Sequence, residues 1–420
     1  MTFASLGLSA PLVSAVAEIG YREPTPAQVE AIPAIARGGD VWVSAMTGSG
    51  KTAAFVLPIL DALSAGASER TRRVRALILA PTRELAVQIG EAIESFGRHL
   101  VVPPKTCIVI GGVSLNPQRM DLRGGADIVV ATPGRLLDLV DTNALQLSSV
   151  EVLVVDEADR LFSLGFGEEL ARVLALLPAR RQNVLLSATF PAAVQTLAER
   201  LLRDPTRINL DAGAVPSSAH ITQRAIEVDA EKRTILLRHL LATEAWPQVL
   251  VFVASRHGAE HVAGKLTRAG IAAAPLHGDL SQGARTKALE DFKAKRVRVL
   301  VATDVAARGL DVVQLAAVVN YDLPRSPVDY VHRIGRTGRA GETGIAISFV
   351  SIDADAHFRL IERRHHLTVA RERVAGFEPV AVATVPARDP SGGVKGKRKS
   401  KKDKLREAAA RAQSTEQKKE

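Results

Sequence analysis

Short apolar runs that end in polar or charged residues recur along this chain, with helix-like stretches between them. In the first half they read DVWVSA (40–45), ALILAPT (76–82), DIVVATP (127–133), EVLVVDEAD (151–159) and NVLLSATF (183–190). Such runs predict strands that are buried on both faces, as in a parallel sheet. Strands that alternate with helices predict a doubly wound α/β fold, in which the polar strand ends share one edge where ligands bind.

The same alternation begins again in the second half of the chain. Its runs are QVLVFVAS (248–255), IAAAPLH (271–277), RVLVATD (298–304), LAAVVNYDL (315–323) and TGIAISFV (343–350). The stretch LLRDPTRINLDAGAVP between the two series lacks the pattern. We therefore expect two tandem parallel-sheet domains at residues 1–207 and 223–380, joined by a linker at 208–222, since 420 residues can bury two cores.

The end of the chain differs from the rest in charge. Residues 390–420 contain eleven Lys/Arg and four Asp/Glu, so they carry +7 of the net charge of +10. With its low complexity, this composition predicts a disordered basic tail at residues 381–420. Clustered basic residues bind nucleic acid by releasing counterions from phosphates, and the alternative is that the tail only keeps the protein soluble.

Cysteine content and hydropathy exclude several classes of protein. Cys107 is the only cysteine, which excludes an intramolecular disulfide and a metal site built from several cysteines. No apolar run is long enough to span a membrane, and the first residues lack the pattern of a signal peptide. We expect a cytoplasmic protein that does not act at a membrane.

The segment MTGSGKT (46–52) follows the first expected strand and precedes an expected helix. In this context it predicts a phosphate-binding loop, because glycines allow backbone N–H groups to surround phosphates. Lys51 would reach the β- and γ-phosphate oxygens, and the Thr52 hydroxyl would coordinate magnesium. Ala45 stands where the general pattern has its first glycine.

Two further segments carry chemistry beside this loop. The run VLVVDEAD places carboxylates either at the end of a buried strand or on an acidic surface turn, and the phosphate loop favours the strand end. The segment GYREPTPAQ (20–28) contains two prolines, which predict an extended loop that ends on Gln28. A side-chain amide can form a bidentate pair with adenine, although a glutamine in such a segment is by itself usually an ordinary loop residue.

The segment YVHRIGRTGRAG (330–341) contains three arginines among glycines. It is either a solvated basic loop or a group of arginines on one side of a helical segment, presented to a phosphate held by the first domain. An arginine used in this way raises the rate of phosphoryl transfer by roughly 10³–10⁵ in related enzymes.

In their order and spacing, these motifs over residues 3–350 resemble those of the DEAD-box ATP-dependent RNA helicases, most like the bacterial RhlE-like type because of DEADRLFSLGF and the short basic tail. The resemblance implies two RecA-like domains, with ATP and Mg²⁺ as cofactors. It implies an RNA-stimulated ATP hydrolase that separates short RNA duplexes or remodels RNA–protein complexes. The implied partner is single-stranded or duplex RNA, read without sequence specificity, with ribosomal precursor particles or RNA-degradation machinery as further candidates.

The resemblance also implies roles for individual residues. Those implied to bind ATP are Phe3, Tyr21, Thr25, Gln28, Thr47, Gly48, Ser49, Gly50, Lys51, Thr52, Gly309, Asp311, Arg336 and Arg339. Those implied to be catalytic are Lys51, Asp156, Glu157, Arg336 and Arg339, with Glu157 activating water and the last two acting as arginine fingers. Magnesium would be held by Thr52 and Asp156, partly through water.

Residues outside the ATP set are implied to couple hydrolysis to strand separation or to hold RNA. The coupling set is Asp159, Ser187, Thr189 and His332, with Asp159 meeting Gln282 or His332. The RNA set is Pro81, Thr82, Arg83, Gly111, Gly112, Thr132, Pro133, Gly134, Arg135, Arg256, Gln282, Arg285 and Thr303. Three departures from the family pattern, Ala27, Met46 and Ser255, remove no catalytic group.

Two other functions are compatible with these residues. A DNA-directed motor would have the same two lobes, and only the family resemblance favours RNA. A non-catalytic protein that locks onto RNA when ATP binds would also need the phosphate loop. The presence of Glu157, Arg336 and Arg339 favours turnover over such a scaffold.

Overall fold

The computed structural model describes residues 1–45, 48–64, 72–210, 221–307, 315–338 and 343–380. The expected tail at 381–420 lies outside these residues. Every strand in the two sheets pairs in parallel with its neighbours. The predicted fold class, two tandem RecA-like α/β domains, is confirmed.

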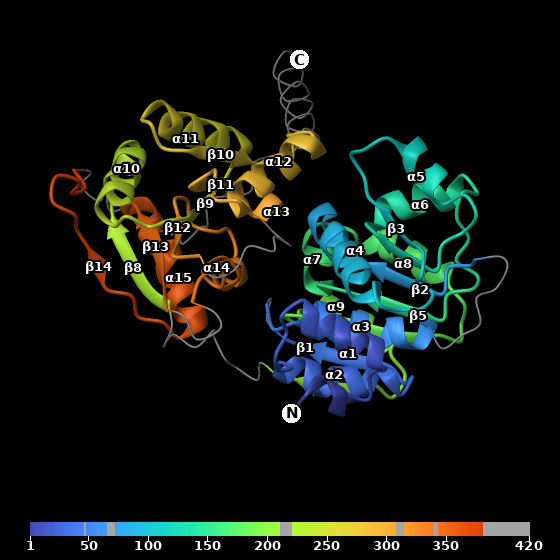
Figure 1. Ribbon diagram of the computed structural model, residues 1–420. Helices are drawn as coiled ribbons and strands as arrows, with labels where there is room; N and C mark the ends of the chain where they lie inside the picture. Colours follow the sequence, from blue (N-terminus) through green and yellow to red (C-terminus); the bar gives the residue numbers. More distant parts are fainter. Residues whose placement is uncertain (46–47, 65–71, 211–220, 308–314, 339–342, 381–420) are drawn as a thin grey trace, which may run out of the picture. The chain divides into compact units, whose positions relative to one another are not determined.

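The first domain contains strands β1 to β7 (Figure 1). Its strands are β1 Val41–Ser44, β2 Ala76–Leu79, β3 Thr106–Val109, β4 Ile128–Ala131, β5 Val152–Val155, β6 Gln182–Ser187 and β7 Thr206–Asn209. Its helices are η1 Phe3–Leu6, α1 Ala10–Glu18, α2 Pro26–Ala36, α3 Lys51–Ser64, α4 Arg83–Gly97, α5 Leu115–Asp121, α6 Pro133–Asp141, α7 Ala158–Ser163, α8 Gly167–Ala175 and α9 Ala192–Leu201.

The second domain contains strands β8 to β14. Its strands are β8 Ile221–Glu227, β9 Val249–Val253, β10 Ala273–Leu276, β11 Val299–Thr303, β12 Ala317–Asn320, β13 Gly344–Val350 and β14 Arg371–Glu372. Its helices are η2 Ala230–Lys232, α10 Arg233–Thr243, α11 Arg256–Arg268, α12 Gln282–Lys293, α13 Asp304–Ala307, α14 Pro327–Ile334, η3 Ile352–Ala354 and α15 Asp355–His365.

The strand order decides which strand ends are neighbours. In the first sheet it is β3-β4-β2-β5-β6-β1-β7, and in the second it is β10-β11-β9-β12-β13-β8-β14. All ten strands expected from the apolar runs are present. Strands β3, β7, β8 and β14 were not expected; three of them begin or end in exposed or half-buried polar residues, and β14 has only two residues.

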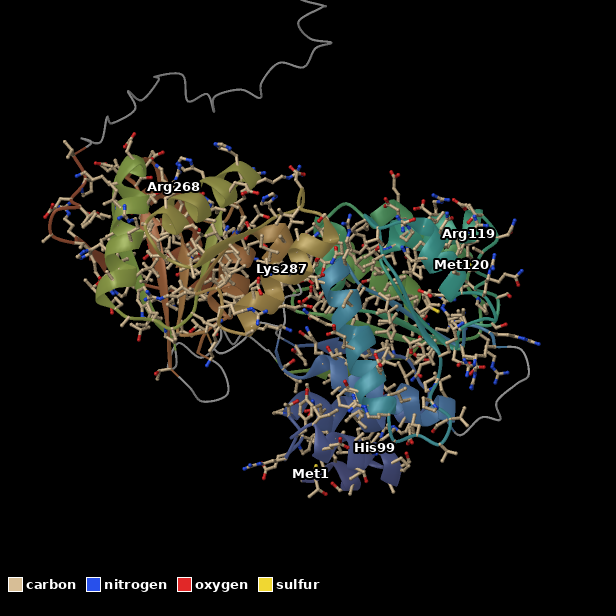
Figure 2. The ribbon with its side chains drawn as sticks, turned by 45° about the horizontal axis from the view of Figure 1, so that its top comes forward. Met1, His99, Arg119, Met120, Arg268 and Lys287 are labelled. Carbon is tan, nitrogen blue, oxygen red and sulfur yellow. The ribbon has the colours of Figure 1, made fainter. Side chains whose placement is uncertain are left out.

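Alternate residues of each strand enter different cores, as a sheet covered by helices on both faces requires. In the first domain one core joins the sheet to α1–α4, and the other joins it to α6–α9. Beyond the end of α4, His99 bonds to Glu18 on α1 and ties the N-terminal helices to this layer (Figure 2). In the second domain α10 and α11 cover one face, and α12–α15 cover the other.

The expected linker at 208–222 overlaps strand residues at both ends. Its first two residues belong to β7, which pairs with β1, and its last two belong to β8, which pairs with β13. Among the helices of the described residues, none has the length and apolarity that crossing a bilayer requires.

Candidate nucleotide and RNA site

The loop before α3 is held in shape by glycine and by the lysine that follows. Gly48 and Gly50 have φ of 81° and 84°, a region that favours glycine. A Cβ on Gly50 would lie 2.5 Å from Nε2 of Gln28, so this position has no room for a side chain. Lys51 begins α3, is 7% exposed and donates from Nζ to the carbonyl oxygen of Ala45 at 2.6 Å. The expected phosphate ligand Thr47 lies outside the described residues.

The segment at residues 20–28, which is expected to bind adenine, has a different local structure from the one predicted. We expected an extended loop ending on Gln28, but α2 begins at Pro26, so Gln28 lies in its first turn. Pro26 is favourable at the first helical position, and Thr25 and Gln28 form a capping box that satisfies the backbone N–H groups of both residues. An interpretation of the sequence in which both prolines prevent a helix misses the start of α2 at Pro26.

The capping box also contacts the phosphate loop. The Thr25 hydroxyl donates to the Ser49 carbonyl at 2.7 Å, and Gln28 Nε2 donates to the Gly50 carbonyl at 3.2 Å. The Gln28 Oε1 accepts from Thr25 N at 2.9 Å. Gln28 is fully buried, and both of its side-chain polar atoms have partners in the chain, so its pairing with an adenine edge stays a prediction.

The aromatic residues of the expected adenine site pack on one another. Phe3 is buried in the first core, and its ring lies 6.3 Å from that of Tyr21. Tyr21 in turn lies 6.1 Å from the ring of Phe96 on α4. These contacts place the N-terminal segment against the helix layer that also contains α3.

The acidic cluster lies at the end of a buried strand, as expected, and not on a surface turn. Asp156 and Glu157 follow β5 directly and are 3% and 8% exposed. Burial is the largest cause that raises the pKa of Asp156 to about 6, with nearby Lys51 opposing the shift and Glu157 adding to it. Glu157 has φ 46° and ψ 53°, a left-handed conformation that costs a non-glycine residue of order 1–3 kcal/mol and is common at functional sites.

Asp159 connects the acidic cluster to the loop after β6. Its Oδ2 accepts from Thr189 N at 3.1 Å and from Thr189 Oγ1 at 2.6 Å. Ser187 accepts from Asp159 N at 3.2 Å and donates to the Thr189 carbonyl at 2.6 Å. Three of the four expected coupling residues are thus joined by hydrogen bonds. The pairing of Asp159 with Gln282 or His332 stays a prediction.

The expected RNA residues of the first domain lie after three other strands. Pro81, Thr82 and Arg83 follow β2, and Thr82 caps α4 by accepting from Leu85 N at 3.2 Å. The remaining residues follow β3 or β4: Gly111, Gly112, Thr132, Pro133, Gly134 and Arg135. Arg135 donates twice to the Val113 carbonyl at 3.0 Å, which links the loop after β3 to the start of α6.

The strand order therefore separates two groups of residues along one edge. The expected phosphate-loop residues follow β1, the expected catalytic carboxylates follow β5, and the coupling residues follow β5 and β6; these three strands are consecutive. The expected RNA residues follow β3, β4 and β2, which are also consecutive. Strands β2 and β5 are neighbours, so the two groups adjoin.

The second domain shows a similar division. Arg256 begins α11 after β9, Gln282 and Arg285 lie on α12 after β10, and Thr303 ends β11. These three strands are consecutive. Arg336 lies beyond α14, which follows β12 on the other side of β9. Gly309, Asp311 and Arg339 lie outside the described residues, whereas His332 lies on α14.

Arg333 and Arg336 do not share one helix, which contradicts the alternative that groups the arginines of this segment on one side of a helix. Helix α14 ends at Ile334 before Gly335, so Arg333 lies in the helix and Arg336 lies beyond it. Arg333 is 2% exposed, and its guanidinium donates to both carboxylate oxygens of Asp304 at 2.6 and 2.8 Å. It therefore braces α14 against the end of β11. Asp304 was missed, although a carboxylate directly after a strand was a usable signal.

The donor set of the first domain fits a magnesium nucleotide. Oxygen ligands suit Mg²⁺, and Asp156 offers a buried carboxylate near Lys51, the residue that precedes Thr52 at the start of α3. Within the described part of the chain, no three His, Cys, Asp or Glu side chains gather to hold a metal ion by themselves.

Comparison with known proteins decides the family. The profile described as DEAD/DEAH box helicase matches residues 25–197, and that of the helicase conserved C-terminal domain matches residues 231–341. The DEAD-box ATP-dependent RNA helicase CshA of Bacillus cereus is 40% identical over 362 residues, which cover 86% of this chain and 68% of that protein. The chain belongs to the DEAD-box family of ATP-dependent RNA helicases. The first match to this DEAD-box chain ends within α9, and the second begins within η2.

Other DEAD-box relatives agree with this assignment. The ATP-dependent rRNA helicase rrp3 of Aspergillus niger is 42% identical over 351 residues, covering 83% of this chain and 74% of that protein. The structure of S. cerevisiae Dbp5 bound to RNA and ADP BeF3 superposes with a TM-score of 0.78 at 30% identity, covering 89% of this chain and 95% of that one. A DEAD box protein from Methanococcus jannaschii gives a TM-score of 0.52 at 36% identity, covering 89% and 99%.

Proposed function

We propose that this protein is an RNA-stimulated ATP hydrolase that locally separates short RNA duplexes or remodels RNA–protein complexes. One observation supports this above the others. In the first domain the phosphate loop, the acidic strand end and the coupling loop lie on consecutive strands, and the expected RNA segments lie on the three strands beside them. A change at one group can therefore reach the other through neighbouring strand ends.

In the proposed reaction Lys51 binds the phosphates, and Glu157 accepts a proton from the attacking water. Lys51 already has one acceptor in Ala45, and its ammonium group has two further N–H donors for phosphate oxygens. Thr52 and Asp156 would hold Mg²⁺, partly through water, and the ion would neutralise charge on the phosphates. Arg336 and Arg339 of the second domain would stabilise charge on the transferred phosphoryl group.

The expected RNA residues of both domains would bind RNA without reading its sequence. The proposed contacts are hydroxyls, glycine amides and single arginines, which bind phosphates and sugars and carry no base code. Because ATP and RNA would each engage both domains, each would favour the same closed arrangement and increase the affinity for the other. Closure would bend one strand and release its partner.

The decisive experiment is the ATPase rate of the full chain with and without single-stranded RNA. We expect clear stimulation by RNA, with Glu157→Gln greatly slowing turnover in both conditions. The absence of stimulation would overturn the proposed closure of the two domains on ATP and RNA. Equal stimulation by single-stranded DNA would favour the DNA-directed motor, and a single turnover at most would favour an ATP-locked scaffold.

Finer aspects of the function belong to the same proposal. Within the family we propose the RhlE-like type, from DEADRLFSLGF and the basic tail, with activity in the cytoplasm. Ribosomal precursor particles or RNA-degradation machinery are the proposed settings. We also propose that the domain boundary falls within the 208–222 linker, because β7 belongs to the first sheet and β8 to the second.

A further inference from the structure

Trp42 on β1 contacts one residue that follows the neighbouring strand β6 and one residue on the neighbouring strand β7. The ring of Phe190, which follows β6, lies 4.8 Å from the Trp42 ring with an interplanar angle of 35°. The guanidinium carbon of Arg207 on β7 lies over the Trp42 ring, 4.8 Å from its centroid. Strands β6 and β7 flank β1, so the indole joins side chains across three strands.

The Trp42 side chain lies on the face of the sheet that is turned away from the phosphate helix. Val41 and Val43 pack into the core that contains α3, whereas Trp42 and Phe190 pack against the opposite core. A substitution at Trp42 therefore leaves the packing beneath Lys51 in place. A substitution at Trp42 can therefore alter the loop after β6 without altering nucleotide binding.

Phe190 is the next residue after Thr189, which holds Asp159. Two hydrogen bonds from Thr189 to the Asp159 carboxylate fix one end of this loop. At the other end, the Phe190 carbonyl accepts from Gln195 Nε2 at 3.0 Å. Between these two sets of hydrogen bonds, the Phe190 side chain packs against the Trp42 ring. This contact orients the backbone that carries Thr189.

Arg207 lies in the last strand of the first sheet. Trp42 and Arg207 are register partners in the parallel pair β1 and β7, so their side chains share one face. Arg207 is exposed, and a guanidinium over an indole is a favourable cation–π contact. From β7 the chain continues toward the second sheet.

We propose that Trp42 is a positioning residue that couples the end of β6 and the following loop, which bear Ser187 and Thr189, to strand β7, from which the chain leaves the first domain. The inference rests on the proposed function. A change in the Asp159–Thr189 contacts during the ATP cycle reaches Phe190, then the indole, and then the strand that leads to the second domain. The indole thus links hydrolysis to domain movement from the face of the sheet opposite the phosphate helix α3.

The test compares three variants of the full chain. Trp42→Ala removes the ring, and Trp42→Phe retains an aromatic ring for Phe190. Leu174→Ala is the matched control, because Leu174 packs on the same core from α8 without being part of this contact set. The measurements are the Michaelis constant for ATP, the RNA-stimulated ATPase rate, and the amount of RNA duplex separated per ATP hydrolysed.

We expect Trp42→Ala to lower duplex separation per ATP by about 2- to 30-fold, the range for substitutions that act on coupling without contacting either ligand. The Michaelis constant for ATP should change by less than about twofold, since the core under α3 is untouched. Trp42→Phe should recover most of the coupling. If Trp42→Ala matches Leu174→Ala in every measurement, or alters only the Michaelis constant, the inference is wrong.

Tryptophan fluorescence gives a second and independent measurement. The chain has two tryptophans, so Trp246→Phe leaves Trp42 as the sole emitter. Its emission should shift when Phe190 is replaced by alanine, and again when RNA and a non-hydrolysable ATP analogue are added together. Constant emission in the second case would overturn the inference. An inactive wild type would instead count against the proposed function, so the two failures are distinct.

Discussion

The guanidinium group of Arg83 occupies the space that a side chain at residue 112 would need. A Cβ built on Gly112 would lie 1.9 Å from Nη1 of Arg83, and Gly112 has φ 74°. A long side chain from the start of α4 therefore passes directly against bare backbone after β3. Both residues belong to the proposed RNA surface, and the glycine keeps the arginine in place.

Replacing Gly112 by alanine should displace Arg83 and weaken RNA binding about tenfold, which corresponds to about 1.4 kcal/mol. ATP affinity without RNA should not change, because the residues around the phosphate loop are on other strands. Equilibrium binding of a labelled single-stranded RNA measures the effect.

Gly124→Ala provides the matched control for this substitution. Gly124 has nearly the same φ, 77°, but a Cβ there meets nothing within 4 Å. The control therefore carries the backbone strain without the clash. Equal losses of RNA affinity in the two variants would show that strain alone acts and that Arg83 is not displaced.

Removing the charge of Lys51 should weaken ATP binding by about 10- to 100-fold, since hydrogen bonds to charged groups contribute about 1.5–3 kcal/mol. Lys51→Ala should also raise the pKa of Asp156 further, because the ammonium group favours the ionised carboxylate. Titration calorimetry measures the nucleotide affinity. Lys51→Arg keeps the positive charge but changes its geometry. Undiminished ATP affinity in Lys51→Ala would count against the proposed phosphate-binding loop.

Glu157→Gln should bind ATP and RNA but hydrolyse ATP about 10²- to 10⁴-fold more slowly, the usual contribution of a general base. The amide has nearly the same shape, so the left-handed backbone at residue 157 is retained. Single-turnover hydrolysis isolates the chemical step, and binding of RNA in the presence of ATP is the control. Turnover at the wild-type rate would remove the proposed role of Glu157.

The sequence predicted the buried strands and their polar ends well, because hydrophobic periodicity depends only on neighbouring residues. Asp156 and Glu157 lie where VLVVDEAD indicated, at the end of β5. The strand order could not be predicted in this way. It comes from long-range pairing, and it is this order that places the loop after β3 beside α6, where Arg135 bonds to Val113.

Residues with local hydrogen-bonding alternatives were predicted less well. Pro26 was treated as a loop residue, yet a proline in the first helical position needs no N–H partner, and the capping box of Thr25 and Gln28 begins the helix. Arg333 could not be told from Arg336 by sequence. Only the folded chain brings Asp304 against Arg333, and these hydrogen bonds give Arg333 a structural role.

Deleting residues 390–420 should weaken RNA binding and reduce its dependence on salt. The segment carries a net charge of +7, and the salt slope should fall by roughly 0.7 for each phosphate of single-stranded RNA that the tail no longer neutralises. Affinities measured over a series of salt concentrations give the slope. Basal ATPase without RNA serves as the control. Identical slopes for the full and shortened chains would assign the tail to solubility alone.

Asp156 should make the nucleotide-free protein less stable as pH rises. Its pKa is raised from 3.8 to about 6, so between these values the folded chain keeps a proton that the unfolded chain has released. The free energy of unfolding should therefore fall through this window and level off above it. A raised pKa of this size corresponds to at most about 3 kcal/mol.

Asp156→Asn removes this titration while nearly preserving the shape of the protonated side chain. Urea unfolding without Mg²⁺ should show similar stabilities for variant and wild type near pH 4, and a variant more stable by up to about 3 kcal/mol above about pH 6. Asp121→Asn, which replaces an exposed carboxylate on α5, controls for the loss of one negative charge. Parallel stability curves for the Asp156 variant and the wild type across this range would show that burial does not hold a proton on Asp156.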